Sequence, residues 1–234
     1  GELEWVGVQL DQTAMPSMLA WKLHKANVLS DEELKNWYGK MLKPAADFLV
    51  EGGLAKILWN DTQITPPATQ QERWEEQSGY SPSTTAAIVA GLITASDIAT
   101  LSGDDKNAQR YLATAKKYSN DIESQMFTTE GNLKGENSDG EYFIRIGQDT
   151  DANSNTKINA NNGREGFNKK QILDGGFLEL VRYGVRGAND ESIVKTLPEY
   201  DDETLEDNLQ VKYSFSFDDG SGTFAGYRRY GNDG

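Results

Sequence analysis

Hydrophobic residues recur at three- and four-residue spacing along much of the first half of the chain, the pattern of helices with one apolar side. It predicts helices over residues 11–28, 31–51 and 104–127. Ser30 and Glu33 form a capping-box pattern before the second of these. Residues 84–101 are small and apolar on nearly every side, which predicts a helix that is buried all round.

The remaining segments carry other patterns. Residues 54–80 show no sustained period and predict a long loop, and residues 128–168 are rich in Gly, Asn, Asp and Thr, which predicts a hairpin among long loops. Helical spacing returns at 172–185 and more weakly at 190–197. Residues 210–230 alternate and turn at Asp219 and Gly220, as a hairpin does. One buried helix among amphipathic ones indicates an inner and an outer layer of helices.

Composition narrows the classes of function. The net charge of −14 argues against binding to nucleic acid or to anionic membranes. The longest nearly uncharged apolar run, around residues 86–95, is shorter than the ~20 residues of a membrane span. The chain has no cysteine and one histidine, His24, which excludes disulfides, thiolate metal sites and multi-histidine metal sites. Carboxylates, amides and aromatic rings remain as the available chemistry.

The segment 69–82 concentrates that chemistry, because Glu72, Glu75 and Glu76 surround Trp74 just before the buried helix. One interpretation is a solvated run of charge that complements the N-terminal dipole of the helix. The other is a functional carboxyl group, since neighbouring carboxylates and an indole raise a carboxyl pKa toward the range of a general acid. Aromatic faces beside hydrogen-bond acceptors also suit a neutral sugar ring. Spacing alone leaves both interpretations open.

Four stretches, in order, resemble one enzyme family. They are WVGVQLD at 5–11, QERWEEQSGYSPST at 71–84, DGGFLELVRYGVR at 174–186 and YRRYGNDG at 227–234. The second and third are long enough to be specific, and together the four extend over nearly the whole chain. The sequence is similar to the bacterial branch of the glucoamylase and glucodextranase family of glycoside hydrolases, family 15.

This resemblance implies an all-α fold of the (α/α)6 toroid type, with β-hairpin and long-loop insertions, and inverting exo-hydrolysis of terminal α-linked glucose. It implies that Glu75 is the general acid. The residues matched to substrate binding are Trp5, Arg73 (through its backbone carbonyl), Glu76, Arg229 and Tyr230. The residues matched to supporting roles are Glu72, Gln9 and Asp11.

The sequence also departs from the family pattern. The family's catalytic base lies well beyond the arginine–tyrosine segment, and the Arg–Asp pair that grips the terminal glucose lies before the first stretch. We therefore expect residues 1–234 to form about half of a toroid, as a partial catalytic domain with no complete second domain. We expect the isolated chain to be inactive and the apolar side of helix 11–28 to face water. Its expected partners are an α-glucan and the remaining segments of the same domain.

Two further interpretations stay open. A helical carbohydrate-binding or scaffold protein without catalysis is the alternative to an enzyme. The loop 149–155 offers oxygen side chains at every second residue, as a calcium loop does, but Ser154 and Ala160 stand where such a loop has Gly and Glu, which favours an ordinary polar loop. We therefore expect no cofactor and no metal ligands. The resemblance favours a secreted bacterial enzyme and leaves a cytoplasmic one open, and it does not separate α-1,4 from α-1,6 linkages.

Overall fold

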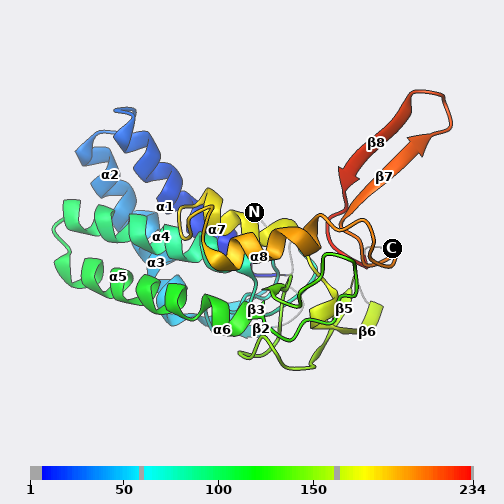
Figure 1. Ribbon diagram of the computed structural model, residues 1–234. Coiled ribbons are helices and arrows are strands. Elements are labelled where there is room, and N and C mark those ends of the chain that lie inside the picture. The colour runs from blue at the N-terminus through cyan, green and yellow to red at the C-terminus, as the bar shows by residue number, and fades with distance from the viewer. Residues whose placement is uncertain (1–6, 58–60, 161–163, 233–234) are drawn as a thin grey trace.

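The computed structural model describes residues 7–57, 61–160 and 164–232. Its helices gather in one body and a β-hairpin projects from the opposite end (Figure 1). The longer helices are α1 (Leu10–Lys25), α2 (Asp31–Trp37), α3 (Lys43–Glu51), α4 (Pro82–Leu101), α5 (Asp105–Asn120) and α8 (Glu191–Tyr200), and the short ones are α6 (Ile122–Met126) and α7 (Leu178–Arg182). The strands form two-stranded antiparallel sheets.

Helix α4 is the central element, as its all-round apolar sequence predicts. It packs against α1, α5 and α7, and most of its side chains are buried. Gly91 allows the close approach of α1, since a Cβ there would lie 2.7 Å from the Cβ of Ala14. By length and composition α4 could cross a membrane, but 67% of that stretch is buried inside the protein, as in the core helix of a globular fold.

The capping box predicted for the second helix is confirmed. The Ser30 hydroxyl accepts the Glu33 backbone N–H at 3.2 Å, and the Glu33 carboxylate accepts the Ser30 N–H at 2.9 Å. The single helix predicted over 31–51 is interrupted by a π-helical turn, Tyr38–Leu42. Pro44 follows this turn and lacks the N–H that would bond one turn back, so the backbone widens before it.

Three further sequence-based boundaries are corrected. The predicted helix 104–127 breaks at Asp121 into α5 and α6, and the predicted helix 172–185 shortens to a 3₁₀ turn, Gly175–Phe177, followed by α7. The predicted loop 54–80 contains a hairpin of β1 (Gly53–Lys56) and β2 (Asp61–Ile64). Asp and Gly residues at the breaks favour turns over continued helix, and strands of four residues are too short to show a period.

The second half of the chain builds the region beside the N-terminal end of α4. Strands β3 (Phe127–Thr128) and β4 (Tyr142–Phe143) pair, as do β5 (Lys157–Ala160) and β6 (Arg164–Asn168). The predicted hairpin near the end of the chain is confirmed as β7 (Lys212–Phe217) and β8 (Gly222–Tyr227). This hairpin leads directly into Arg228, Arg229 and Tyr230.

Candidate active site

The segment 69–81 is a closed loop that other elements hold in place. Thr69 and Gly79 exchange backbone hydrogen bonds of 3.0 and 2.9 Å across its neck. The Thr69 hydroxyl accepts the backbone N–H of Leu10 at 3.2 Å, which ties the loop to the start of α1. On the other side Tyr80 and Gly147 exchange bonds of 2.7 and 3.0 Å. The loop is therefore positioned by residues 59 places earlier and 67 places later in the chain.

Glu72 is the buried carboxylate of the loop. Its Oε1 lies 2.7 Å from Nη2 of Arg145, and both side chains are 0% exposed. Burial raises the pKa of Glu72 to about 7, and the nearby carboxylate of Asp174 adds to this, although Arg145 opposes it. The raised carboxyl pKa anticipated for this run therefore belongs to Glu72.

Glu76 is held by groups from two distant segments. Its Oε2 lies 3.2 Å from Nη2 of Arg145 and accepts the Tyr230 hydroxyl, while its Oε1 lies 2.9 Å from Nη1 of Arg229. The Glu76 side chain is 5% exposed. The structure thus brings Glu72, Glu76, Arg229 and Tyr230 together, as the resemblance implied.

Glu75 differs from its two neighbours because its side chain is exposed. Its backbone lies in the left-handed region (φ 63°), and its N–H donates to the Glu72 carbonyl at 2.8 Å. A tight turn at Glu75 thus accompanies the change from buried Glu72 to exposed Glu75. No hydrogen bond or ion pair engages its carboxylate within the described parts of the chain.

The aromatic rings of Trp74 and Tyr230 lie beside these charged side chains. The Trp74 ring lies 6.4 Å from the Tyr230 ring, centroid to centroid, and its Nε1 donates to Oδ2 of Asp174 at 3.0 Å. The guanidinium of Arg73 lies 4.7 Å from the Trp74 centroid, and that of Arg229 lies 5.9 Å from it. Burial raises the pKa of Asp174, and the charge of Arg73 opposes the rise.

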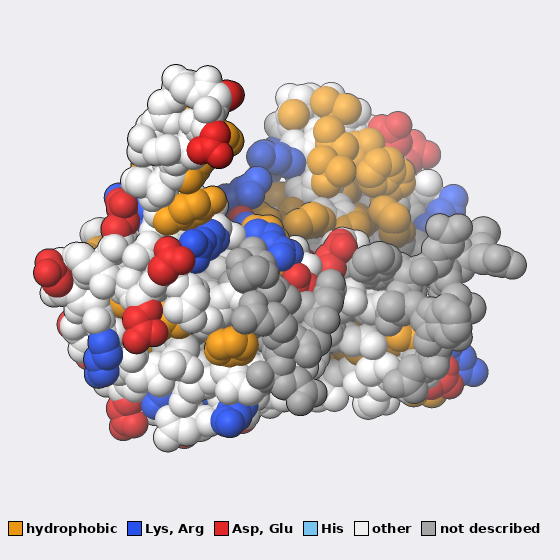
Figure 2. All heavy atoms as spheres, turned by 90° about the vertical axis from the view of Figure 1, so that its right-hand side faces the viewer, with side chains coloured by type: hydrophobic (Ala, Val, Ile, Leu, Met, Phe, Trp, Pro, Cys, Tyr) orange, Lys and Arg blue, Asp and Glu red, His pale blue; other side chains and the backbone are white. Residues whose placement is uncertain are grey.

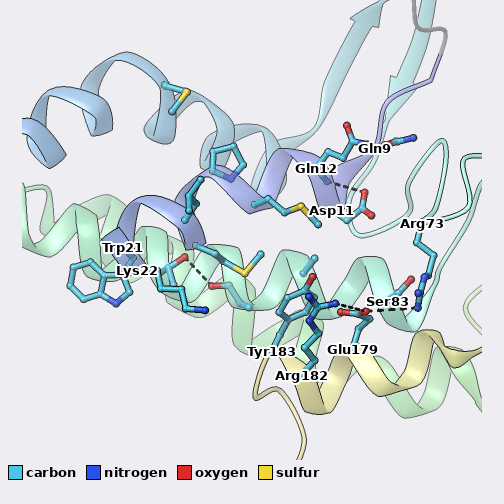
Figure 3. A pocket seen from close by; sticks show the side chains of 18 of the residues that line it. Gln9, Asp11, Gln12, Trp21, Lys22, Arg73, Ser83, Glu179, Arg182 and Tyr183 are labelled. Atoms are coloured by element: carbon cyan, nitrogen blue, oxygen red, sulfur yellow. Dashed lines mark hydrogen bonds and ion pairs between the residues drawn. The ribbon is translucent and has the colours of Figure 1, made fainter. Parts of the chain in front are cut away.

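Gln9, Asp11 and Arg73 line a groove of about 1210 Å³ between α1, α4 and α7 (Figure 3). Burial raises the pKa of Asp11; its backbone hydrogen bonds and the charge of Arg73 oppose the rise, and the charge of Glu75 adds to it. Arg73 also lies 3.9 Å from Glu179 of α7. Glu75 is not among the residues that line this groove.

The groove is otherwise apolar. Met15 and Leu19 of α1 are 43% and 58% exposed there, and Met41 is 45% exposed. The prediction that the apolar side of the first helix faces water is confirmed.

A second hollow lies beside the projecting hairpin. Figure 2 shows this recess, with charged side chains at its base and apolar side chains on the opposite wall.

The loop 149–155, considered as a calcium site, holds a lysine ammonium among its oxygens. Nζ of Lys169 lies 2.7 Å from Oδ1 of Asp149 and 2.5 Å from the Asp151 carbonyl. Nζ of Lys170 lies 2.9 Å from the Asn153 carbonyl. Partial burial opposes ionisation of Asp149, but Lys169 and the hydroxyl of Thr156 hold its pKa below the usual range. The chain's own cations thus take the acceptors that a calcium ion would use.

Trp5 lies outside the described residues. Sequence reasoning missed two site residues, Arg145 and Asp174, as contributors of side chains. Arg145 stands in the apolar run 142–146, where it is the one charged residue, and that could have marked it as a buried cation. Asp174 begins the stretch 174–186, and no local pattern there marks its side chain as part of the site.

Comparison with known proteins shows the family of this chain. The family model of the glycosyl hydrolases of family 15 matches residues 1–234. A glucoamylase of Clostridium sp. (strain G0005) is 37% identical over 197 residues, which are 84% of this chain and 24% of that protein. A crystal structure of bacterial glucoamylase complexed with acarbose matches with a TM-score of 0.77 and 35% identity, covering 98% of this chain and 28% of that chain.

The chain thus spans about a quarter of the length of these relatives. Its inner and outer helices form part of an (α/α)6 toroid, with hairpins and long loops inserted between them. The loop 69–81, its buried Arg145 pair and the arginine–tyrosine segment occur within one sequence that the family model matches from end to end. This chain belongs to family 15 of the glycosyl hydrolases.

Proposed function

We propose that the chain supplies the general acid and part of the sugar-binding surface of an inverting hydrolase that releases terminal α-linked glucose from glucans. The main supporting observation is that two adjacent glutamates of the loop 69–81 differ, since one is exposed and the other is held in place. Glu75 is exposed and unpaired within the described residues, so it can reach a glycosidic oxygen. Its neighbour Glu76 is fixed by Arg145, Arg229 and Tyr230, as a residue that holds a substrate hydroxyl must be.

Inversion needs a second carboxylate on the far side of the sugar, ~6.5–9.5 Å from the acid, with room for a water. Glu72 is a poor candidate because Arg145 engages it in a fully buried pair. We propose that no residue of this chain is the base and that residues 1–234 act as part of a larger catalytic domain. The exposed apolar groove along α1 and the length of the relatives support this.

The stereochemistry of the product tests the proposal. The complete enzyme, incubated with an α-glucan and followed by NMR from the first turnovers, should release glucose in the β-form. Glucose released first in the α-form would overturn inversion. The 234-residue chain alone should release none, and glucose release by that chain would show that it carries its own base.

The same sample distinguishes the non-catalytic alternative. A carbohydrate-binding or scaffold protein would bind the oligosaccharide, measured by calorimetry, and leave it intact even when the complete protein is used. The bacterial relative was crystallised with acarbose, which makes that compound a suitable ligand for the titration. Binding of acarbose together with glucose release supports the hydrolase.

A further inference from the structure

Arg145 is a fully buried cation of the site, and the proposed chemistry names it only as one of the groups that fix Glu76. Its side chain is 0% exposed, and its backbone N–H is fixed to the carbonyl of Ile172 at 2.9 Å. Its guanidinium carbon lies 3.6 Å from the centre of the Tyr230 ring. The residue therefore occupies a fixed place under the aromatic wall of the site.

One nitrogen of Arg145 makes both of its ion pairs. Nη2 lies 2.7 Å from Glu72 and 3.2 Å from Glu76, whereas the buried Nε and Nη1 have no hydrogen-bond partner in the described residues. Arginine–carboxylate pairs are frequently bidentate, with two parallel hydrogen bonds from the fork of donors to one carboxylate. Buried donors left without partners are costly and rare in native proteins. Arg145 is therefore placed so that one nitrogen contacts two carboxylates, while its other two donor nitrogens are left without hydrogen-bond partners in the described residues.

The orientation of the Glu76 carboxylate is consequently set by the groups that bind each of its two oxygens. Oε2 is directed inward, to Arg145 and to the hydroxyl of Tyr230, and Oε1 is directed toward Arg229, whose side chain is 43% exposed. Without Arg145, the carboxylates of Glu72 and Glu76, which share its Nη2, would lie close together with less positive charge between them. Repulsion between like charges would then turn Glu76 away from this orientation.

We propose that Arg145 is a positioning residue that holds Glu76, with Glu72 as the counter-anchor, in the orientation that binds the sugar. This rests on the proposed function, because it assigns Arg145 to the sugar-binding side of that same site. Arg145 acts through Glu76 and does not touch the reacting bond, so its loss should weaken substrate binding more than turnover.

The test compares Arg145→Met and Arg145→Lys with the wild type in the complete enzyme, using KM and kcat on a malto-oligosaccharide. We expect Arg145→Met to raise KM about 10- to 100-fold, since a charge-assisted contact is lost, with a change in kcat of less than about tenfold. Arg145→Lys keeps the charge and loses the planar fork, so its KM should lie between the other two.

Arg186→Met is the matched control. Arg186 also forms an ion pair over a long sequence separation, 2.7 Å from Glu123, and donates to the Ser119 carbonyl, but in the described parts of the chain it makes no hydrogen bond or ion pair with a site residue. Its replacement should lower the melting temperature and leave KM unchanged. Melting curves of all variants separate loss of stability from loss of positioning.

The outcomes decide the inference. If Arg145→Met behaves like Arg186→Met, with a lower melting temperature and an unchanged KM, the residue is only structural and the inference is overturned. If Arg145→Met does not fold, Arg145→Lys decides, since a raised KM supports the inference and an unchanged one overturns it. A wild-type enzyme that releases no glucose from any α-glucan overturns the proposed function itself, and the positioning role with it.

Discussion

The indole of Trp74 donates a hydrogen bond of 3.0 Å to the carboxylate of Asp174, which lies 100 residues further along the chain. The other oxygen of Asp174 accepts the backbone N–H of Gly176 at 2.9 Å, at the start of the 3₁₀ turn before α7. Through these two hydrogen bonds the carboxylate of Asp174 joins the loop 69–81 to the start of α7, and Asp174 itself is only 3% exposed. The side chain that places the tryptophan is therefore a buried acid.

Replacing Trp74 with Phe should lower the free energy of unfolding by about 1–3 kcal/mol, because Oδ2 of Asp174 would be left buried without its donor. Chemical denaturation at pH 7 measures this. The control is Trp37→Phe at the end of α2, where the ring packs on the core and its N–H makes no hydrogen bond in the described residues. Equal losses for the two variants would show that ring area, and not the hydrogen bond, determines the effect.

Glu75→Gln tests the general acid. Turnover of unactivated α-glucosides in the complete enzyme should fall roughly 10²- to 10⁴-fold while ligand binding is kept, because the amide cannot protonate the leaving oxygen. The loss should be smaller for a substrate whose leaving group departs without a proton. Glu32→Gln, at an exposed carboxylate of α2, serves as the control. Equal losses on both kinds of substrate would refute the role given to Glu75.

Glu199 gives a pH dependence of stability outside the site. Its side chain is fully buried in α8, one oxygen accepts the Asp139 backbone N–H at 2.8 Å, and the other has no partner in the described residues. Burial raises the pKa of Glu199 from 4.5 to about 7. Between these two values the native state holds a proton that the unfolded state has released, so the free energy of unfolding falls as the pH rises through this window.

Glu199→Gln should remove that decrease and stabilise the protein at pH 7 by roughly 1–2 kcal/mol, because a neutral amide is less costly to bury than a charge. Denaturant titrations at pH 4.5, 6 and 7.5 measure the slope. Glu72 contributes in the same direction, so part of the slope should remain. Glu136→Gln, at an exposed carboxylate, should keep the wild-type slope of unfolding free energy against pH. If Glu199→Gln shows that same slope, the prediction is contradicted.

Lys169 should be needed for stability in the loop 149–155. Its side chain is fully buried while Asp149 is 33% exposed, so Lys169→Met removes the charged donor of Asp149 and of the Asp151 carbonyl and should cost about 1–3 kcal/mol. Lys117→Met, which breaks the more exposed pair with Asp121 on α5, should cost less than about 1 kcal/mol. Similar costs for the two lysines would contradict this.

A chelator should leave the wild-type melting temperature unchanged, since Lys169 and Lys170 already engage the acceptors of this loop. A decrease in melting temperature on addition of EDTA, reversed by calcium, would instead indicate a metal ion in the loop. The measurement needs only differential scanning calorimetry of the wild-type protein.

The sequence by itself determined where the main helical segments and the terminal hairpin lie, because their apolar residues repeat at the periods of helix and strand, but it did not determine the breaks within those segments. It determined that 84–101 would be a buried helix, since no polar side was available to face water. It also placed Glu72, Glu75 and Glu76 in one loop of a family 15 glycosyl hydrolase, because that motif is local and specific.

Only the tertiary structure decided which of these acids is buried. Three carboxylates within five residues of a loop have no period, and a left-handed turn at Glu75 separates the exposed one from the other two. Only the tertiary structure brought Arg145 to Glu72 and Glu76 and placed it under Tyr230, across 69 to 85 residues of chain. Such contacts follow from how distant elements pack on α4, and no local pattern of residues encodes them.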